Sequence, residues 1–555
     1  MNRLFADIAL NLPSSGTFQY SVPEPLETSA VPGKRVWVSL RTRRMIGTIV
    51  GLSHERVVEG VRDIDSVIED APLLSESFLR LTRWMSEYYF CSWGQCLEAG
   101  LPAPFRKGKF VMKSRAKKWN ESAERVNPED LLLAPHQEAA YAEVLKKMKS
   151  GQAGSFLLYG ITGSGKTEVY MHLIREALAE GKGAIVLVPE ISLTPQTIDR
   201  FYSRFGETLA LVHSRLPQAR RVEEWRRIDA GQAKVVVGAR SAIFSPVKNL
   251  GLILIDEEHE TSYKQEETPR YEARRVAAKR AEIENAVVVT GSATPSLESF
   301  FESEAGGVRR LSLPERIERR PLPAVEIVDM RRQFQGKMPL IFSKTLEEGI
   351  RESFSKKEQA MLLLNRRGFS TYLHCASCGY VMVCENCRIS LAYHYDKASL
   401  FCHVCHYRTT PQRLCPGCRK GYLHYFGIGT QKVESEAARL FPGARIGRMD
   451  SDSTLKKDAH ELILRAFKRR EIDILIGTQM IAKGHDFPHV SLIGVISADT
   501  ALHIPDFRAA ERTFSLLTQV AGRAVKTPGP TTMTRSTPGK FNSAESFACR
   551  RFLNW

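Results

Sequence analysis

Short runs of alternating hydrophobic and polar residues fill the first hundred positions of the chain. A period of two predicts β-strands with one buried face, and the pair Pro32-Gly33 predicts a turn between two of them. Residues 77–89 have instead the spacing of a helix and end in aromatic residues. The pattern predicts a small β-rich domain, residues 1–105, whose strands are residues 18–22, 35–40 and 45–50.

From about residue 131 the pattern changes, and strand-sized apolar runs alternate with amphipathic helices such as residues 167–180. This alternation is typical of α/β folds, in which helices cover parallel sheets. A stretch rich in Pro and Arg, residues 314–323, separates two groups of these elements and predicts two lobes. The expected strands are residues 155–159, 184–188, 234–237, 252–255, 286–290, 361–364, 472–476 and 492–496.

The composition adds a basic charge to this organisation. The chain has 79 Lys and Arg against 62 Asp and Glu, a net charge of +17. This balance favours a polyanionic partner, with nucleic acid as the first candidate, although a merely basic solvated surface remains an alternative. Residues 106–118 hold seven basic and no acidic side chains. They begin a linker, residues 106–130, that can also contact phosphates.

The distribution of apolar residues along the chain does not indicate a membrane protein. Residues 1–16 lack the apolar core of a signal peptide, and no run of about 18 apolar residues occurs in the chain. We therefore expect a cytoplasmic protein with no membrane partner, in a compartment where thiols stay reduced.

Residues 160–167 match the pattern GxxxxGK[ST] between an expected strand and an expected helix. Glycine at three positions lets backbone N–H groups converge on phosphates, while Lys166 reaches the β- and γ-phosphates and Thr167 holds Mg²⁺. The pattern predicts ATP and Mg²⁺ as cofactors. The expected nucleotide-binding residues are Gly160, Gly163, Gly165, Lys166 and Thr167.

The strand at residues 252–255 leads directly into an acidic cluster. Ligands bind α/β sheets at the carboxyl ends of strands, so Asp256 is expected beside the phosphates, where it can hold the metal. Glu257 can orient or deprotonate the attacking water. We expect Lys166, Asp256 and Glu257 to be catalytic.

Eight of the eleven cysteines form four CxxC pairs within residues 373–422. One CxxC turn offers two thiolates to a metal ion, so two turns complete a tetrahedral site with no position open for catalytic water. We expect two structural Zn²⁺ ions, with a pairing that the spacing leaves open. The expected ligands are Cys375, Cys378, Cys384, Cys387, Cys402, Cys405, Cys415 and Cys418.

Other candidate ligands lie near these pairs or elsewhere in the chain. Because eight thiolates suffice for two ions, the neighbouring histidines are expected at the surface or behind the ligands: His374, His394, His403 and His406. The remaining cysteines are expected to pack without chemistry: Cys91, Cys96 and Cys549.

A set of short motifs resembles those of superfamily-2 helicases. Residues 256–259, Asp-Glu-Glu-His, resemble the DEAH-type box, and residues 291–296 resemble the third motif, which couples the nucleotide state to DNA. The resemblance implies two RecA-like lobes that form an ATP-driven motor. The other matches are residues 477–487 with the fifth motif, 519–523 with the sixth, and 187–194 and 237–241 with DNA-contacting motifs.

A closer resemblance is to the PriA family of replication-restart helicases. Three features support it: the amino-acid sequences of residues 187–196 and 237–244, the inserted CxxC pairs, and the patterns at residues 17–20 and 33–38. It implies a bacterial, nucleoid-associated, monomeric 3′ to 5′ DNA helicase that acts at stalled or branched forks and starts primosome assembly. The implied partners are forked DNA, single-stranded DNA, single-strand-binding protein and primosome proteins.

The resemblance also implies a division into domains. The N-terminal domain captures the 3′ end of a nascent strand, and the cysteine-rich segment interrupts the second helicase lobe. The implied ranges are 1–105 for the N-terminal domain, 131–312 for the first lobe, 313–372 and 423–524 for the second, 373–422 for the double zinc insertion and 525–555 for an unmatched tail.

Further residue roles come from the resemblance alone. Gln519 and Arg523 of the sixth motif face the nucleotide and are expected to be catalytic. The cysteine pairs are expected to nest, so that the outer two pairs share one ion and the inner two share the other. Expected DNA contacts are Phe18, Tyr20, Arg240, Tyr263, Lys264, Tyr271, Thr478 and Lys483.

The sequence departs from the family pattern at three places. Only about 25 residues separate the N-terminal domain from the first lobe, too few for the family's winged helix. Gln19 stands where the family often has Asp. After Arg523, Lys526 replaces the second arginine of the motif, and the tail shows no strand or helix pattern, as expected of a frameshift or of a short form.

These departures keep two other functions open. A duplex DNA translocase would hydrolyse ATP without separating strands. A non-catalytic fork-binding protein would result if the second lobe, without its closing elements, supplied no working arginine. ATP hydrolysis stimulated by duplex without unpaired ends would indicate the first alternative, and fork binding without hydrolysis the second.

Overall fold

The computed structural model describes residues 3–14, 16–106, 108, 132–190, 193–317, 324–330, 341–364, 372–375, 377–394, 398–426, 429–450, 459–478, 481, 487, 489–498, 500–503, 506–522 and 531–535. The chain divides into two compact units, Met1–Ile317 and Glu318–Trp555. The boundary falls inside the Pro- and Arg-rich stretch of residues 314–323.

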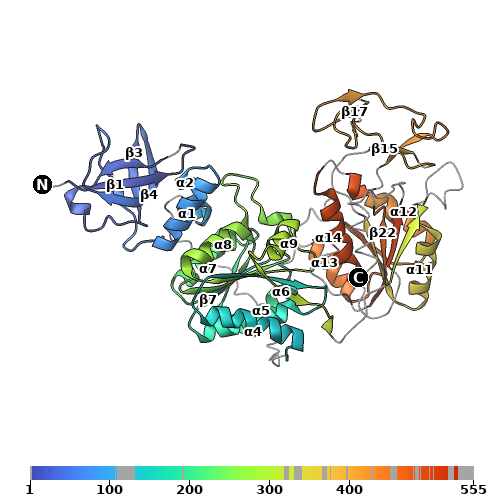
Figure 1. Ribbon diagram of the computed structural model, residues 1–555, viewed down its shortest axis with the longest axis horizontal. Coiled ribbons are helices and arrows are strands. Elements are labelled where there is room, and N and C mark those ends of the chain that lie inside the picture. The colour runs from blue at the N-terminus through green and yellow to red at the C-terminus, as the bar shows by residue number, and fades with distance from the viewer. Residues whose placement is uncertain are drawn as a thin grey trace. The chain divides into compact units, whose positions relative to one another are not determined.

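The N-terminal part of the first unit is a five-stranded antiparallel sheet in the order β2-β1-β4-β3-β5 (Figure 1). The sequence missed β1 because it is buried on both faces and lacks a period of two. Three helices follow, and Ser75 begins the first by accepting a hydrogen bond from the Phe78 amide. The elements are β1 (Phe5–Leu10), β2 (Phe18–Ser21), β3 (Arg35–Leu40), β4 (Arg43–Ser53), β5 (Ser66–Val67), α1 (Glu76–Tyr88), α2 (Trp93–Ala99) and α3 (Ala103–Arg106).

A seven-stranded parallel sheet, in the order β12-β6-β11-β10-β7-β9-β8, forms the rest of the first unit. Its strands are β6 (Gly154–Gly160), β7 (Gly183–Leu187), β8 (Leu209–Val212), β9 (Val235–Gly238), β10 (Leu250–Asp256), β11 (Val287–Ser292) and β12 (Arg309–Leu313). Every residue of β7 and β9 is buried, which explains why these strands appear in the sequence as continuous apolar runs.

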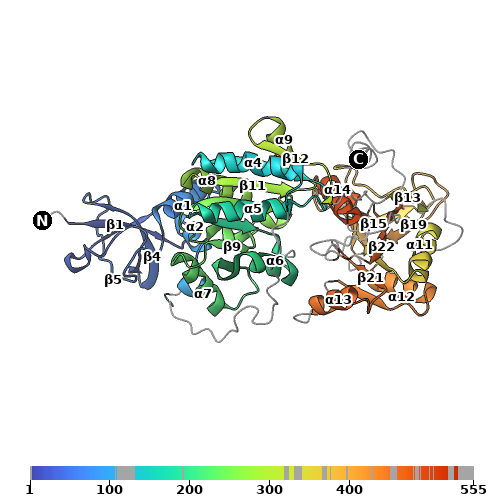
Figure 2. The same cartoon turned by 90° about the horizontal axis from the view of Figure 1, so that it is seen from below.

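Helices cover both faces of this sheet, and their apolar sides form two core layers. Helices α4, α5 and α6 cover one face and α7 and α8 the other (Figure 1), while α4 also runs beside β12 (Figure 2). The sheet therefore brings the carboxyl ends of its strands to one edge, where α/β folds bind ligands. The helices are α4 (Pro135–Lys149), α5 (Lys166–Ala179), α6 (Pro195–Phe205), α7 (Gln218–Asp229), α8 (Ala273–Glu284) and α9 (Leu297–Glu304).

The second unit contains a six-stranded parallel sheet in the order β13-β23-β22-β14-β21-β20. Helices α11 and α12 pack on one face, and α13 and α14 on the other. The elements are β13 (Val325–Asp329), α11 (Lys344–Ser355), β14 (Gln359–Leu364), α12 (Thr430–Leu440), β20 (Ile446–Met449), α13 (Ala459–Lys468), β21 (Ile474–Gly477), β22 (Val490–Ile496), α14 (Ala509–Ala521) and β23 (Thr531–Arg535).

The strand β23 corrects the prediction that the tail, residues 525–555, holds no strand. It pairs in parallel with β13 on one side and β22 on the other. Three of its five residues are threonines, which are β-branched and favour extended backbone. A strand paired along both edges in a parallel sheet does not need alternating hydrophobic and polar residues, so a period of two does not reveal it.

The cysteine-rich insertion has two small antiparallel sheets of its own. They are built from β15 (Tyr372–Cys375) with β19 (Leu423–Phe426), and from β16 (Ala392–His394), β17 (Ser399–Phe401) and β18 (Arg408–Thr409). Short 3-10 helices elsewhere are Glu24–Leu26, Gly206–Thr208, Arg240–Phe244, Thr261–Tyr263 and Thr500–His503.

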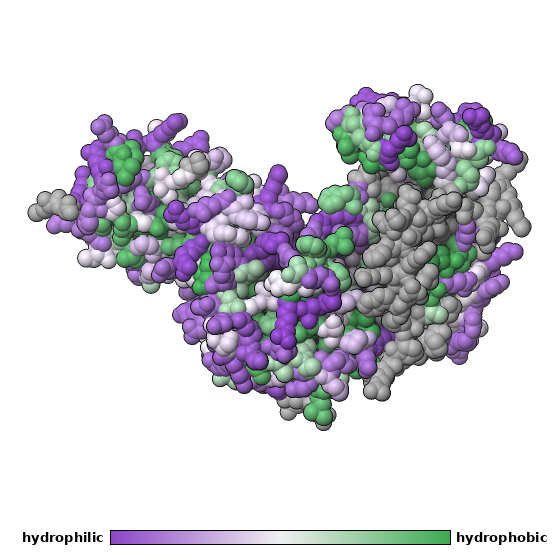
Figure 3. Space-filling model, viewed as in Figure 1, coloured by the Kyte–Doolittle hydropathy of each residue, from purple (hydrophilic) through white to green (hydrophobic). Residues whose placement is uncertain are grey.

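The face of the molecule in Figure 3 carries mostly hydrophilic side chains with scattered hydrophobic ones. Among the helices of the described ranges, none combines the length and the apolarity that a bilayer crossing requires.

Candidate active site and metal centres

The phosphate loop runs from the end of β6 to the start of α5. Gly163 and Gly165 have φ angles of +83° and +80°, a left-handed backbone that glycine adopts without strain. Lys166, the first residue of α5, donates a hydrogen bond from Nζ to the Gly160 carbonyl at 2.7 Å. The loop thus curls around the lysine head group, and the helix start supplies backbone N–H groups for an anion.

Three residues outside the predicted site contact this loop. Gln137 is 4% exposed, accepts the Ala134 amide at 2.8 Å and donates to the Ser164 carbonyl at 2.8 Å. On another side, Ile317 donates its amide to the Gly163 carbonyl at 3.0 Å, and Arg316 Nε lies 3.1 Å from where a Cβ of Gly163 would be. The capping role of Gln137 could have been predicted from the sequence, because glutamine three residues after a helix N-cap commonly accepts the N-cap backbone N–H.

The acidic cluster stands at the carboxyl end of β10, as the sequence predicts. The Tyr170 hydroxyl donates a hydrogen bond to Asp256 Oδ1 at 3.2 Å. Burial and, to a lesser degree, the neighbouring Glu257 carboxylate together raise the pKa of Asp256 to about 6, against the opposing effect of the Lys166 ammonium. Glu257 has a φ of +48°, so the chain turns sharply where the two carboxylates diverge. A divalent cation beside Asp256 would favour its charged form.

Glu258 anchors the acidic cluster to two other elements. Its carboxylate is fully buried and accepts hydrogen bonds from the Ser296 amide at 2.7 Å, the Ser299 hydroxyl at 2.8 Å and Arg274. His259 Nδ1 lies 2.7 Å from the Ser292 hydroxyl. The acidic cluster and the motif at residues 291–296 are therefore one hydrogen-bonded assembly.

The loop after the acidic cluster does not present its aromatic rings to solvent. Tyr263 is 1% exposed and its hydroxyl contacts the carbonyls of Leu187 at 3.1 Å and Asp256 at 2.7 Å; Tyr271 is 3% exposed. Packing covers both rings in this arrangement, and their expected contact with DNA stays a prediction. The sequence could not distinguish a buried from an exposed tyrosine at these positions.

Arg240 and Lys264 lie beside this loop, and their charged groups are near the protein surface. Arg240 donates to the carbonyls of Ser262 at 2.9 Å and Lys264 at 2.6 Å. The Lys264 ammonium lies 5.3 Å from the centre of the Tyr89 ring and also contacts the Arg270 carbonyl. Both cations are thus held by the loop that contacts Asp256.

The eight cysteines of the insertion form two groups of four, and within each group the ligand atoms lie within 4.8 Å of one another. Sulfur pairs in them are 3.5 to 3.8 Å apart, close to the separation of about 3.8 Å that Zn–S bonds of about 2.3 Å give around a tetrahedral ion. The grouping is nested. One group is Cys375, Cys378, Cys415 and Cys418, and the other is Cys384, Cys387, Cys402 and Cys405.

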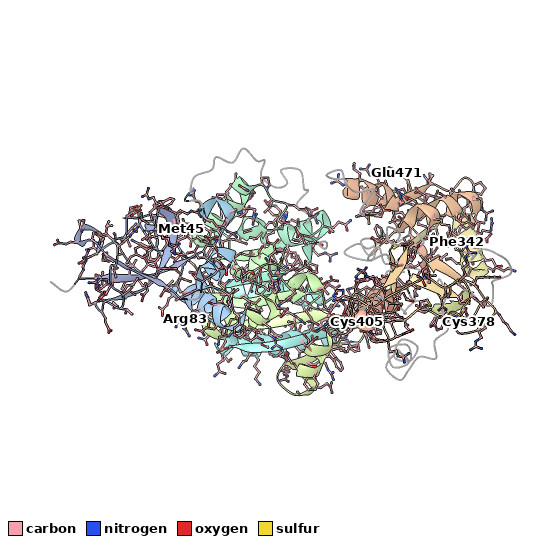
Figure 4. All side chains as sticks on the ribbon, turned by 90° about the horizontal axis from the view of Figure 1, so that it is seen from above. Met45, Arg83, Phe342, Cys378, Cys405 and Glu471 are labelled. Carbon is pink, nitrogen blue, oxygen red and sulfur yellow. The ribbon has the colours of Figure 1, made fainter. Side chains whose placement is uncertain are left out.

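The turns around these thiols suit metal binding. The amides of Lys420 and Gly421 lower the pKa of Cys418 to about 6, and the Tyr407 amide lowers that of Cys405 to about 6, whereas burial raises the pKa of Cys378 and the contact with Cys405 raises that of Cys387, both to about 12. Thiolates are the form that binds a metal ion. Figure 4 labels one cysteine of each group, Cys378 and Cys405, and they lie well apart. Neither group includes a histidine.

Comparison with known proteins relates these sites to a family. Three family models match: a 3′ DNA-binding domain (3′BD) at residues 7–102, a DEAD/DEAH box helicase at 134–302 and a helicase conserved C-terminal domain at 424–527. The replication restart protein PriA of Treponema pallidum is 40% identical over 524 residues, which cover 93% of this chain and 78% of that protein. This chain belongs to the PriA family.

A second PriA relative, from Bacillus subtilis, is 50% identical over 416 residues, which are 75% of this chain and 52% of that protein. The chain thus spans about half the length of this relative. Among solved structures, RecG bound to a three-way DNA junction aligns with a TM-score of 0.45 at 17% identity, covering 78% of this chain and 45% of its own.

The PriA-type N-terminal domain places its two candidate aromatic residues differently. Tyr20 is 4% exposed and belongs to the core of the five-stranded sheet, with its hydroxyl on the Ser39 carbonyl at 3.3 Å. The ring is packed inside the sheet, and its expected contact with a DNA end stays a prediction. Phe18 is only partly buried, and Gln19 ties β2 to the loop at Glu55 and Val57.

The candidate residues of the second PriA helicase domain are only partly described. Gln519 is buried on α14, and Thr478 is half-buried after β21, with its amide 3.4 Å from the Met449 carbonyl. Lys483 and Arg523 lie outside the described residues.

Proposed function

We propose that this PriA-family chain is an ATP-dependent 3′ to 5′ DNA helicase that acts at stalled or branched replication forks and starts primosome assembly there. The observation that carries the proposal is the joint hydrogen-bonded frame of the phosphate loop and the acidic cluster. β6 and β10 are strands of one sheet: Lys166 begins the helix α5 that follows β6 and donates to the Gly160 carbonyl at the end of β6, and Asp256 ends β10 and accepts a hydrogen bond from Tyr170 of α5.

The proposed roles follow from this frame. The backbone around Gly160, Gly163 and Gly165 and the Lys166 ammonium bind the phosphates of ATP. Thr167 and Asp256 hold Mg²⁺, which neutralises phosphate charge when bound. Glu257 orients the attacking water. Gln519 and Arg523 are the proposed catalytic residues of the second unit.

Contacts with DNA are proposed at cations and at one aromatic residue. Arg240, Lys264 and Lys483 neutralise backbone phosphates, and Thr478 donates a hydrogen bond to them. Phe18 is kept as a candidate for the 3′ end because its ring is not fully packed. The proposed partners are forked and single-stranded DNA, single-strand-binding protein and primosome proteins, and the proposed setting is the nucleoid.

Two structural Zn²⁺ ions are proposed for the insertion, one in each four-cysteine group. Thiolate is the ligand that a tetrahedral structural zinc site takes, and four protein ligands leave no position for substrate. The ions would hold together a segment too small to bury a sufficient core.

Strand displacement tests the proposal directly. Matched DNA forks with a 3′ or a 5′ tail are incubated with the protein and ATP, and released single strand is measured. Release from the 3′-tailed fork alone is expected. Lys166→Ala should lower ATP turnover by at least about 100-fold, since it removes a charge that contacts the transferring phosphate.

The surface variant Lys182→Ala is the matched control, because Lys182 pairs with exposed Glu180 and lies away from the loop. ATP hydrolysis without strand release would favour a duplex translocase. Fork binding without hydrolysis would favour a non-catalytic fork-binding protein.

A further inference from the structure

Two cysteines lie in contact at the short turn between α1 and α2, residues 89–92, which we call the elbow. Cys91 Sγ and Cys96 Sγ lie 3.2 Å apart. Ser92 is the N-cap of α2, so Cys91 precedes the cap and Cys96 is the fourth residue of the helix. Side chains at these two positions pack together at many helix starts, which explains how residues five apart are brought into contact. Neither thiol belongs to the two metal-binding groups.

The elbow joins helices with different neighbours. Next to α1, the Tyr89 hydroxyl accepts a hydrogen bond from the Glu272 amide at 3.1 Å, at the start of α8 in the first helicase lobe. In α2, a Cβ at Gly94 would lie 2.0 Å from the Leu10 carbonyl, so this helix is pressed against β1 of the N-terminal sheet. The two cysteines therefore lie in the segment that connects α1, beside the lobe, to α2, beside the N-terminal sheet.

Cation–π and backbone contacts hold the elbow in its present form. The Arg83 guanidinium, labelled in Figure 4, lies 5.3 Å from the centre of the Trp93 ring and bridges α1 and α2. The Cys91 amide donates to the Ser86 carbonyl at 3.2 Å, and the Ser86 hydroxyl donates to the Cys91 carbonyl at 2.6 Å. The sulfur contact thus belongs to a fixed local structure.

The two thiols differ in access and acidity. Cys91 is partly exposed, whereas Cys96 is fully buried. A hydrogen bond from the Cys96 thiol lowers the pKa of Cys91, and the same contact together with burial raises the pKa of Cys96. Cys91 is therefore the thiol that an oxidant reaches, and Cys96 is held against it as a second nucleophile.

We propose that Cys91 and Cys96 form a reversible oxidation site for hydrogen peroxide. The Cys91 thiolate attacks one peroxide oxygen, the O–O bond breaks, and sulfenic acid forms with release of hydroxide. The Cys96 sulfur then attacks the sulfenic sulfur, the S–O bond breaks, and a disulfide forms. The protons of the two thiols convert both hydroxides to water, so peroxide is reduced by the two electrons that the thiols lose.

The disulfide requires little movement. Its S–S bond of about 2.05 Å is about 1.2 Å shorter than the present contact. The disulfide would link Cys91, before the N-cap of α2, to Cys96 in the second turn of α2, and it would reduce local unfolding of residues 91–97. The proposal is independent of the helicase function.

Tryptic digestion makes the test direct, because cleavage after Arg83 and Arg106 releases both cysteines in one peptide without the other nine. The zinc-loaded full chain is treated with dilute peroxide, alkylated and digested. Peptide 84–106 is expected two hydrogens lighter and without alkyl groups, and dithiothreitol before alkylation should restore both alkyl groups. Amide hydrogen exchange over residues 91–97 should slow in the oxidised protein.

Two variants test the order of steps. Cys96→Ser should leave a Cys91 sulfenic acid that a dimedone probe labels, and Cys91→Ser should give neither label nor disulfide. If burial of position 96 prevents Cys96→Ser from folding, Cys91→Ser alone carries the comparison. Alkylation of both thiols after peroxide treatment, or sulfinic acid at Cys91 with Cys96 still alkylated, would overturn the proposal.

Discussion

The phosphate loop and the cysteine insertion are both compact binding regions, yet they are held in opposite ways. The loop lies on a seven-stranded sheet with two buried core layers, and protein groups such as Gln137 bond directly to its backbone. The insertion has small sheets and a core in which four of the nine buried residues are cysteines. Protein contacts therefore set the shape of the loop, whereas the proposed zinc ions would organise the insertion.

The largest expected effect is on the insertion. Cys402→Ser removes one of four thiolates from the inner group, and structural zinc contributes an apparent binding free energy of about 10–16 kcal/mol to folding in small zinc modules. We expect the protein to bind one Zn²⁺ fewer and residues 377–394 to become sensitive to protease. Metal analysis and limited proteolysis measure both, with Cys549→Ser as control. Two retained zinc ions would exclude Cys402 as a ligand.

An intermediate effect is expected at the frame of the acidic cluster. Arg274→Ala leaves the buried Glu258 carboxylate without its cation, and breaking such a pair costs about 3–5 kcal/mol when both partners are buried. Arg274 is 24% exposed, so we expect a loss of about 2–3 kcal/mol in unfolding free energy, measured by urea denaturation of the first unit's transition.

The matched control for that variant is the next residue along α8. Arg275→Ala removes an exposed pair with Glu302, and we expect a change of less than about 1 kcal/mol. Equal losses for the two variants would mean that the Glu258 network does not stabilise the lobe.

The smallest expected effect concerns the support of the phosphate loop. Gln137→Ala removes the side-chain bonds to Ala134 and Ser164 and should weaken binding of ADP by about 1–2 kcal/mol, roughly 5- to 30-fold. Titration with a fluorescent ADP analogue measures this, and exposed Glu138→Gln is the control. An unchanged affinity would mean that the loop keeps its shape without Gln137.

Local patterns in the sequence predicted much of the nucleotide site and the cysteine pairs. The loop motif lies between β6 and α5, and Asp256 ends β10. The spacing of glycine and lysine that binds phosphate also determines the turn from strand to helix, so the motif predicts both. The CxxC pairs came from spacing alone, and their nested grouping required the family resemblance. These features depend on residues close together in the chain.

Features that depend on distant residues were missed. Arg316 lies against Gly163 although about 150 positions separate them, and no local pattern encodes that contact. Tyr20, Tyr263 and Tyr271 were expected to contact DNA, but tertiary packing buries them. The strand β23 is recognisable only from its two neighbours in the sheet. Cys91 and Cys96 were treated as separate thiols because their contact arises at a helix cap.

We propose that Lys166, Asp256 and Glu257 together hydrolyse ATP in response to DNA. Steady-state ATPase activity of the zinc-loaded chain, with and without a fork carrying a 3′ end, tests it most directly. We expect strong stimulation by the fork, and we expect Glu257→Gln to lose turnover while it retains ATP binding. Absence of ATP hydrolysis under both conditions, with fork binding intact, would contradict it.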